Sequence, residues 1–181
     1  QVSRQVYEAL VQRGLDMKIG PALATKWKTT DPNTWVFTLR EDAKFSDGSG
    51  MTSEDVVFSI LRAKQRTSDF KEYISTVSNV EAVGDYAVKI ITSKPNPILL
   101  NQLSNIFIMS KAWSENNFAT SPQNWDAGQE TFSATNALGT GPFKITKREP
   151  NTRTVFKRNS HWWGEMKDKG LTTIELLPIK N

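Results

Sequence analysis

The sequence contains no cysteine, which excludes thiol catalysis, zinc–thiolate sites and disulfide bonds. This absence also fits an oxidising compartment, where a stray thiol is a liability. Histidine occurs once, as His161, between Ser160 and a pair of tryptophans. A histidine in a metal site or in serine–histidine chemistry usually stands among carboxylates or other histidines, so a structural role is favoured here. We therefore expect no metal site and no cofactor.

Long apolar runs are also absent. No stretch approaches the roughly 18 apolar residues that a membrane-spanning helix needs. The chain does not begin with Met, and no basic-then-apolar leader follows Gln1. Residues 1–12 instead have the spacing of an amphipathic helix, which we expect to stop near Gly14. Its apolar face is Val2, Val6, Ala9 and Leu10. We interpret Gln1 as the start of a processed chain or of a piece of a longer one.

Clustered charge is the third absence. The 23 basic and 19 acidic residues give a net charge of +4, and they are interspersed without a block of five like signs. A nucleic-acid surface needs clustered basic residues, so we expect no nucleic-acid partner. Apolar residues make up 38% of the 181 residues and include six Trp and nine Phe. That content is enough for a packed core in one ordinary domain or two small ones.

The clearest helix is predicted for residues 52–65. Thr52 or Ser53 caps its N-terminus, where the acidic side chains of Glu54 and Asp55 favour the helix dipole. The stripe expected to be buried is Val56, Val57, Ile60 and Leu61. Glu54 and Asp55 could also indicate general acid–base chemistry, but adjacent helical positions point in different directions. Because no candidate pair of carboxylates has supporting context, we expect the protein not to be an enzyme.

Alternation of apolar and polar residues predicts several strands. They are a strand at 35–40, a hairpin at 77–93, a hairpin around Pro150–Asn151, a last strand at 172–179 and a buried strand at 105–110. Short helices are expected within 95–104 and 111–117, and the polar residues 114–135 read as a long loop or a boundary. Hairpins and strands interleaved with a few helices predict an α/β or α+β layered domain.

The stretch NALGTGPFKI, residues 136–145, raises the question of a phosphate site. A dinucleotide fingerprint needs a helix after its glycines, and a P-loop needs Gly-Lys-Ser/Thr. Here Pro142 follows Gly141 and an alternating strand begins, so a phosphate site is excluded. Gly139 and Gly141 can instead permit a tight turn into the strand, a bend at a cleft, or the close approach of another backbone.

Two long stretches resemble the hallmarks of one family. PALATKWKTTDPNTWVFTLREDAKFSDGSGMTSEDVVFSILRAK resembles P-x-L-A-x-x-W, a strand ending in Leu-Arg, lysine-aromatic-x-Asp-Gly and T-x-E/Q-D-V-V-x-S. LGTGPFKITKREPNTRTVFKRNSHWWG resembles GTGP-aromatic, a hairpin and R-N-x-x-(Tyr/Trp)-Trp-Gly. These are the motifs of the family 5 extracellular solute-binding proteins, which serve ABC importers of peptides, dipeptides and nickel. The two motifs occur in the family's order and cover most of the chain.

The resemblance implies a periplasmic-binding-protein type II-like α/β fold that is incomplete here. Proteins of the family have two lobes that enclose the ligand, and they are much longer than this chain. By resemblance, residues 1–15 and 131–181 belong to the main sheet of lobe one. Residues 16–130 form its smaller subdomain of hairpins and helices, and the second lobe is absent.

The resemblance also implies a function. The protein would be the periplasmic, or lipid-anchored, substrate-binding component of an ABC importer. It would capture a peptide-like solute, an oligopeptide or a dipeptide, by hinge closure and deliver it to membrane permease subunits. Nickel complexes, opines and sugars are alternatives within the family. An acidic residue of the other lobe binds the ligand's amine, so we expect this chain alone to bind peptide weakly or not at all.

The resemblance points to ligand-binding residues in two segments, Asn105, Ile106, Phe107, Gly139 and Thr140. Ile106 and Phe107 fit ordinary core positions equally well. Asn105 could simply cap the preceding helix or start a strand. The Trp162–Trp163 pair could stack on a ligand, but the family places it away from the cleft, and core packing is favoured.

Overall fold

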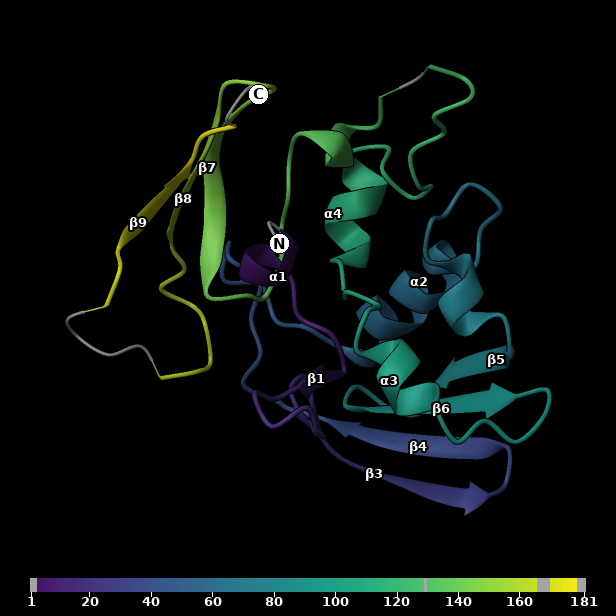
Figure 1. The fold of residues 1–181 in the computed structure, drawn as a ribbon. Helices are drawn as coiled ribbons and strands as arrows, with labels where there is room; N and C mark the ends of the chain where they lie inside the picture. The colour runs from purple at the N-terminus through teal and green to yellow at the C-terminus, as the bar shows by residue number, and fades with distance from the viewer. Residues whose placement is uncertain (1–2, 129, 166–169, 179–181) are drawn as a thin grey trace.

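The computed structural model describes residues 3–128, 130–165 and 170–178 (Figure 1). The helices are α1 (Ser3–Val6), α2 (Ser53–Ala63), α3 (Leu99–Leu103) and α4 (Lys111–Asn116), with short 3-10 turns η1 (Lys71–Ile74) and η2 (Phe132–Ala134). The strands are β1 (Val11–Arg13), β2 (Ile19–Pro21), β3 (Ala24–Asp31), β4 (Thr34–Leu39), β5 (Val77–Ala82), β6 (Ala87–Thr92), β7 (Phe143–Glu149), β8 (Arg153–Arg158) and β9 (Thr173–Leu176).

A four-stranded antiparallel sheet with the order β3-β4-β6-β5 lies below helices α2 and α3 in the view of Figure 1. Its register places Phe37 of β4 between Trp27 of β3 and Val88 of β6. The predicted strand at 35–40 and the hairpin at 77–93 are both confirmed, with Gly84 at the turn in a positive-φ conformation. Alternation was a reliable signal here because one face of this sheet is buried against helices.

One continuous hydrophobic core lies between this sheet and the helices. It combines Phe37, Val88 and Ile90 from the sheet with residues of the helices α2 and α3, among them Ile60 and Leu103. All five are at most 2% exposed. The predicted helical segments 95–104 and 111–117 are confirmed as α3 and α4.

Helix α2 confirms the predicted helix and its cap. The backbone N–H of Thr52 donates to the Asp55 carboxylate at 2.8 Å, and the backbone N–H of Lys111 donates to its other oxygen at 2.8 Å. Asp55 therefore caps α2 and also holds the start of α4. The prediction that Leu61 is buried is wrong, since it is 51% exposed. Val56 and Ile60 face the core, so the apolar stripe is narrower than the sequence indicated.

The prediction of one helix over 1–12 is wrong. Helix α1 ends at Val6, and strand β1 begins at Val11, where it pairs with β2. Ala9 and Leu10 are buried as predicted, but their carbonyl oxygens accept hydrogen bonds from the backbone of Leu23 and Ala24. These distant backbone partners replace helical hydrogen bonds. The expectation for Val2 falls outside the described residues.

The prediction of a buried strand at 105–110 is wrong in form. Phe107 makes a single antiparallel bridge with Ala9, and no strand continues from it. Ile106 and Ile108 are buried as expected, at 2% and 0% exposure. The backbone N–H of Ile108 donates to the carbonyl of Glu8 at 2.9 Å. This segment is a buried connection whose backbone is paired with the N-terminal segment.

A separate three-stranded antiparallel sheet has the order β7-β8-β9 and stands beside α1 (Figure 1). The predicted hairpin around Pro150–Asn151 is confirmed, with Asn151 at a positive φ of 59°. The last strand is confirmed at Thr173–Leu176, and residue 179 of the prediction lies outside the described residues.

Gly139 and Gly141 lie where the chain enters the β7-β8-β9 sheet, just before β7. Neither is among the glycines with positive φ. A Cβ on Gly139 would overlap the carbonyl oxygen of Val6, and one on Gly141 would lie 2.7 Å from the carbonyl oxygen of Gln5. The Gly141 N–H donates to Val6 at 2.8 Å. Of the roles left open by the sequence, the close approach of another backbone is therefore the one that the structure adopts.

Candidate functional site

The main candidate site is a cavity of about 410 Å³ beside α2. Its walls come from α2, from the loop that follows α2, from the 106–109 segment and from the loop over residues 122–135. Tyr7 and the turn between β7 and β8 complete it. Segments far apart in the sequence thus meet at one hollow of the size that binds small ligands.

Arg62 of α2 fixes one wall of the cavity. Its Nε donates to the carbonyl of Ala119 at 3.0 Å, and its Nη2 donates to the carbonyl of Ser121 at 3.0 Å and to Ser133 Oγ at 3.3 Å. Burial lowers the pKa of Arg62, and the nearby Tyr7 opposes that shift. The guanidinium therefore ties the loop that follows α4 to helix α2.

Ser59, one turn earlier on α2, holds the part of the wall formed by residues 106–109. Its hydroxyl donates to the carbonyl of Asp55 at 2.7 Å and accepts the backbone N–H of Met109 at 2.8 Å. The 106–109 segment is thereby held without belonging to a sheet. The family motif T-x-E/Q-D-V-V-x-S ends at Ser59, but its partner could not be read from the sequence, and no motif position marks Arg62. The partners Met109 and Ala119 lie 50 and 57 residues away.

Tyr7 lines the cavity beside Phe107, and the two ring centroids are 6.5 Å apart. Burial raises the pKa of Tyr7 to about 12, against the opposing effects of Arg62 and of a hydrogen bond with the backbone of Leu138. The phenol is therefore neutral at physiological pH.

The predicted binding residues separate into two groups. Ile106 and Phe107 line the cavity. Asn105 lies at the end of α3, where its amide donates to the carbonyl of Asn101 at 3.1 Å and its oxygen accepts from Arg4 at 3.3 Å.

Gly139 and Thr140 lie at the junction between the sheets. The carbonyl of Gly139 accepts the backbone N–H of Ser46 at 3.0 Å, and Thr140 is fully buried. Neither they nor Asn105 are among the described residues that line the cavity. A binding role for all five residues stays a prediction.

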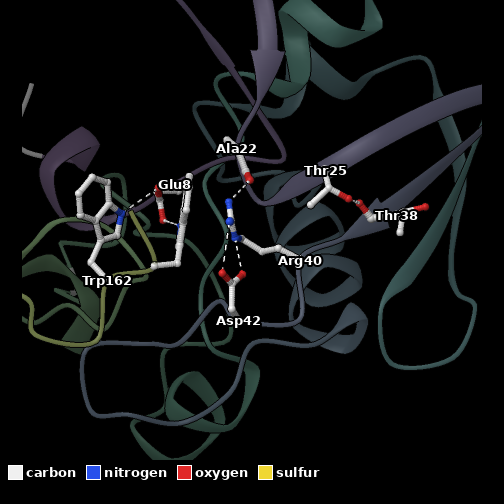
Figure 2. Close-up of polar contacts among 8 residues, drawn as sticks. Glu8, Ala22, Thr25, Thr38, Arg40, Asp42 and Trp162 are labelled. Atoms are coloured by element: carbon white, nitrogen blue, oxygen red, sulfur yellow. Dashed lines mark hydrogen bonds and ion pairs between the residues drawn. The ribbon is translucent and has the colours of Figure 1, made fainter. Parts of the chain in front are cut away.

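The two tryptophans of the second motif converge on one carboxylate. The indole N–H groups of Trp162 and Trp163 donate to the two oxygens of Glu8 at 3.3 and 2.9 Å, and Figure 2 shows Trp162 facing Glu8. Burial raises the pKa of Glu8, and the hydrogen bonds from the indoles oppose that shift. Trp163 also packs against the core, as the sequence favoured, whereas Trp162 is not among the residues packed against it.

Arg40 extends this contact towards the four-stranded sheet. Its guanidinium lies over the Trp163 ring, 3.2 Å from the centroid. It also pairs with Asp42 at 2.7 Å and donates to the carbonyl of Ala22 at 3.1 Å (Figure 2). A cation over the face of an indole ring is attracted to the ring, so the contact between Arg40 and Trp163 helps to hold this junction together. The junction between the sheets is thus made of a carboxylate, two indoles and a guanidinium.

His161 lies against Gly48, where a Cβ would be 3.3 Å from the imidazole. Among the described residues, no group of three His, Cys, Asp or Glu side chains is placed to hold a metal ion. Within that same part of the chain, no helix has the length and apolar character to cross a bilayer.

Several known proteins are similar to this chain in sequence and in fold. The family model "Bacterial extracellular solute-binding proteins, family 5 Middle" matches residues 18–181. The periplasmic murein peptide-binding protein MppA of Escherichia coli is 29% identical over 99% of this chain and 35% of its own length.

Two solved structures are similar as well. NikZ from Campylobacter jejuni in complex with Ni(L-His) is 26% identical, with a TM-score of 0.84 over 97% of this chain and 34% of its own. AgaA from A. tumefaciens R10 in complex with agropinic acid is 26% identical, with a TM-score of 0.82 over 96% of this chain and 34% of its own. The chain thus spans about a third of the length of these proteins. They share its mixed sheet-and-helix fold, of the periplasmic-binding-protein type II class.

Proposed function

This chain belongs to the bacterial extracellular solute-binding proteins of family 5, and we propose that it captures a peptide-like solute for an ABC importer. The solute would be an oligopeptide or a dipeptide. The observation that carries the proposal is the 410 Å³ cavity, which is lined by aromatic rings and pinned backbone segments and lies in a chain similar to a murein peptide-binding protein. An aromatic cavity with polar groups around it suits a peptide, which carries apolar side chains on a polar backbone.

We further propose that the partners are the solute and the membrane permease subunits of the importer, and that the protein acts in the periplasm or on a lipid anchor. Residues 1–15 and 131–181 would belong to the main sheet of lobe one, and residues 16–130 would form its smaller subdomain. The separate β7-β8-β9 sheet supports a boundary before β7. Strand β1 pairs with β2 across residue 15, so the boundary at that residue rests on the resemblance alone. Asn105, Ile106, Phe107, Gly139 and Thr140 remain the proposed ligand-binding residues, with Ile106 and Phe107 supported by their place in the cavity.

The protein would bind without bond chemistry. MppA, NikZ and AgaA are described by what they bind, which supports a binding role over a hydrolytic one. The second candidate function is binding of a nickel complex or an opine, favoured by the similarity to NikZ and AgaA.

The test is a thermal melt of this chain with three separate ligands, a pool of di- to pentapeptides, nickel–histidine and agropinic acid. A ligand at about 100 times its dissociation constant adds roughly 2.7 kcal/mol to the free energy of unfolding, so the peptides are used at millimolar concentration to reveal weak binding. We expect only the peptide pool to raise the melting temperature. A shift with nickel–histidine or agropinic acid alone would favour the second candidate.

Mass spectrometry of the recovered peptides completes the test. Intact peptides after long incubation are expected of a binding protein. Cleavage that persists through purification would instead establish an enzyme.

A further inference from the structure

An exposed indole marks one side of the cavity. Trp125 is 70% exposed although it lies in the loop that Arg62 pins to α2. Phe70 lines the same cavity from the loop after α2 and is 41% exposed. A large apolar side chain on the surface is ordinary, but here two partly exposed aromatic side chains line a cavity that Tyr7 and Phe107 also line.

The charged groups at this cavity balance. Arg62 and Arg148 line it together with Asp69 and Glu130, two of each sign. The guanidinium of Arg62 already donates to two backbone carbonyls and a hydroxyl. The walls therefore carry no net charge that would select a ligand group of one sign, and a buried charge would lose its hydration. An uncharged apolar group is the better occupant.

The polar surface lies on the other side of Trp125. A second cavity of about 340 Å³ borders the first and shares Trp125 with it, together with Thr67, Ser68, Asp69 and Gln123. Its other described lining residues are polar or charged, including Arg66, Lys71 and Asp126. The rings of Tyr7, Phe70 and Phe107 line the first cavity alone. An apolar side chain of a peptide would lie in the first cavity while the polar groups next to it face the second.

The volume sets the size of the occupant. A cavity of 410 Å³ is at the low end of the roughly 300–1,000 Å³ range of ligand sites. It holds one large side chain with part of its backbone, and a whole oligopeptide would extend beyond it. Both flanking walls are fixed to α2 through Ser59 and Arg62, so the hollow is formed before ligand arrives.

We propose that this cavity is the subsite for an aromatic side chain of the peptide, with Trp125 as the ring on which it stacks. The inference rests on the proposed peptide binding. It adds the class of side chain that the solute carries.

The test compares four tripeptides that differ only in the central residue, Ala-Phe-Ala, Ala-Ala-Ala, Ala-Lys-Ala and Ala-Glu-Ala. Dissociation constants are measured by NMR titration of this chain at millimolar peptide. We expect Ala-Phe-Ala to bind about tenfold more tightly than the other three, since aromatic pairs stabilise beyond their buried area. Equal binding of all four would overturn the inference and leave the peptide function standing. Binding of none would count against both.

Two variants assign the preference to the cavity. Trp125→Ala should reduce the affinity for Ala-Phe-Ala about tenfold and leave that for trialanine within about twofold. The matched control is Phe118→Ala, which removes a 92% exposed ring from the same loop that does not line the cavity. Phe70→Ala serves as a second cavity variant should Trp125→Ala alter the fold. If Phe118→Ala lowers the preference for Ala-Phe-Ala as much as Trp125→Ala or Phe70→Ala does, this cavity is not the aromatic subsite.

Discussion

The four-stranded sheet and the β7-β8-β9 sheet of this protein are stabilised in different ways. The four-stranded sheet shares one continuous hydrophobic core with α2 and α3. In the described strands of the β7-β8-β9 sheet, Phe156 alone is fully buried, and no residue of those strands belongs to that core. This smaller sheet joins the rest at a junction of close backbone contacts and polar side chains. An apolar core tolerates adjustment, whereas such a junction demands particular residues.

The largest expected effect comes from the shared core. Phe37→Ala should lower the free energy of unfolding by about 3–5 kcal/mol, because it empties a fully buried site at the centre of the four-stranded sheet. Chemical denaturation measures the loss. For comparison, Phe156→Ala should speed hydrogen exchange mainly in β7, β8 and β9. Equal acceleration of exchange in both sheets would show that they unfold as one unit.

The glycine pair tests the junction directly. Gly139→Ala should destabilise the protein by about 1–3 kcal/mol or more, because the new methyl group would overlap the Val6 carbonyl and the backbone must shift. Gly50→Ala is the control, since nothing lies within 4 Å of its Cβ position. Thermal melts of both variants give the comparison. A loss of equal size at Gly50 would mean that backbone entropy, and not the close contact, decides the effect.

Removal of the carboxylate at the junction should have a somewhat smaller effect. Glu8→Ala leaves the indole N–H groups of Trp162 and Trp163 without their acceptor. We expect a loss of about 1–2 kcal/mol, because these groups are only half-buried. Glu54→Ala is the matched control, as it removes an exposed carboxylate paired with Lys111 in the first turn of α2, and it should cost less, under about 1 kcal/mol. Tryptophan fluorescence follows the change at the two rings.

The smallest effect expected is a pH dependence from Glu8. Burial raises the pKa of its carboxyl group above the usual 4.5, so the folded state holds the proton more tightly than the unfolded state. The resulting stabilisation is complete below pH 4.5 and is lost as the pH rises through the raised pKa. The variant Glu8→Gln cannot titrate at this position. The difference in unfolding free energy between the native protein and this variant should therefore fall over that window, and a flat difference would contradict the shift.

Local patterns in the sequence predicted much of the fold correctly. The strand over β4 and both hairpins follow from alternation, and α2 follows from its cap and its apolar spacing. The N-terminal helix failed because Ala9 and Leu10 have helical spacing while their carbonyls pair with Leu23 and Ala24. The 105–110 strand failed for the same reason, since its apolar run is buried without a strand partner beyond Ala9. Burial was predicted correctly in both segments, and the backbone conformation was not.

The candidate site was the least predictable part. The family resemblance pointed to Ile106 and Phe107, while no motif position marks Tyr7, Arg62 or Trp125. Ser59 ends the motif T-x-E/Q-D-V-V-x-S, but the motif does not say what it contacts. Their roles depend on loops that meet only when α2 is in place. One signal was available for the junction, because Glu8 is the single charged residue between Tyr7 and Val11. A carboxylate in an apolar stretch needs partners, and the two indoles supply them.

By itself, the sequence determined the family, the order of most strands and helices, and the need for small residues at 139 and 141. These features depend on patterns among residues within about ten positions of one another, or on the two long family motifs present in the chain. Only the tertiary structure decided that the glycines admit the backbone of α1, that the two tryptophans hold Glu8, and that segments far apart in the sequence line one cavity. Each of these depends on contacts between residues distant in the sequence, and neither periodicity nor composition contains that information.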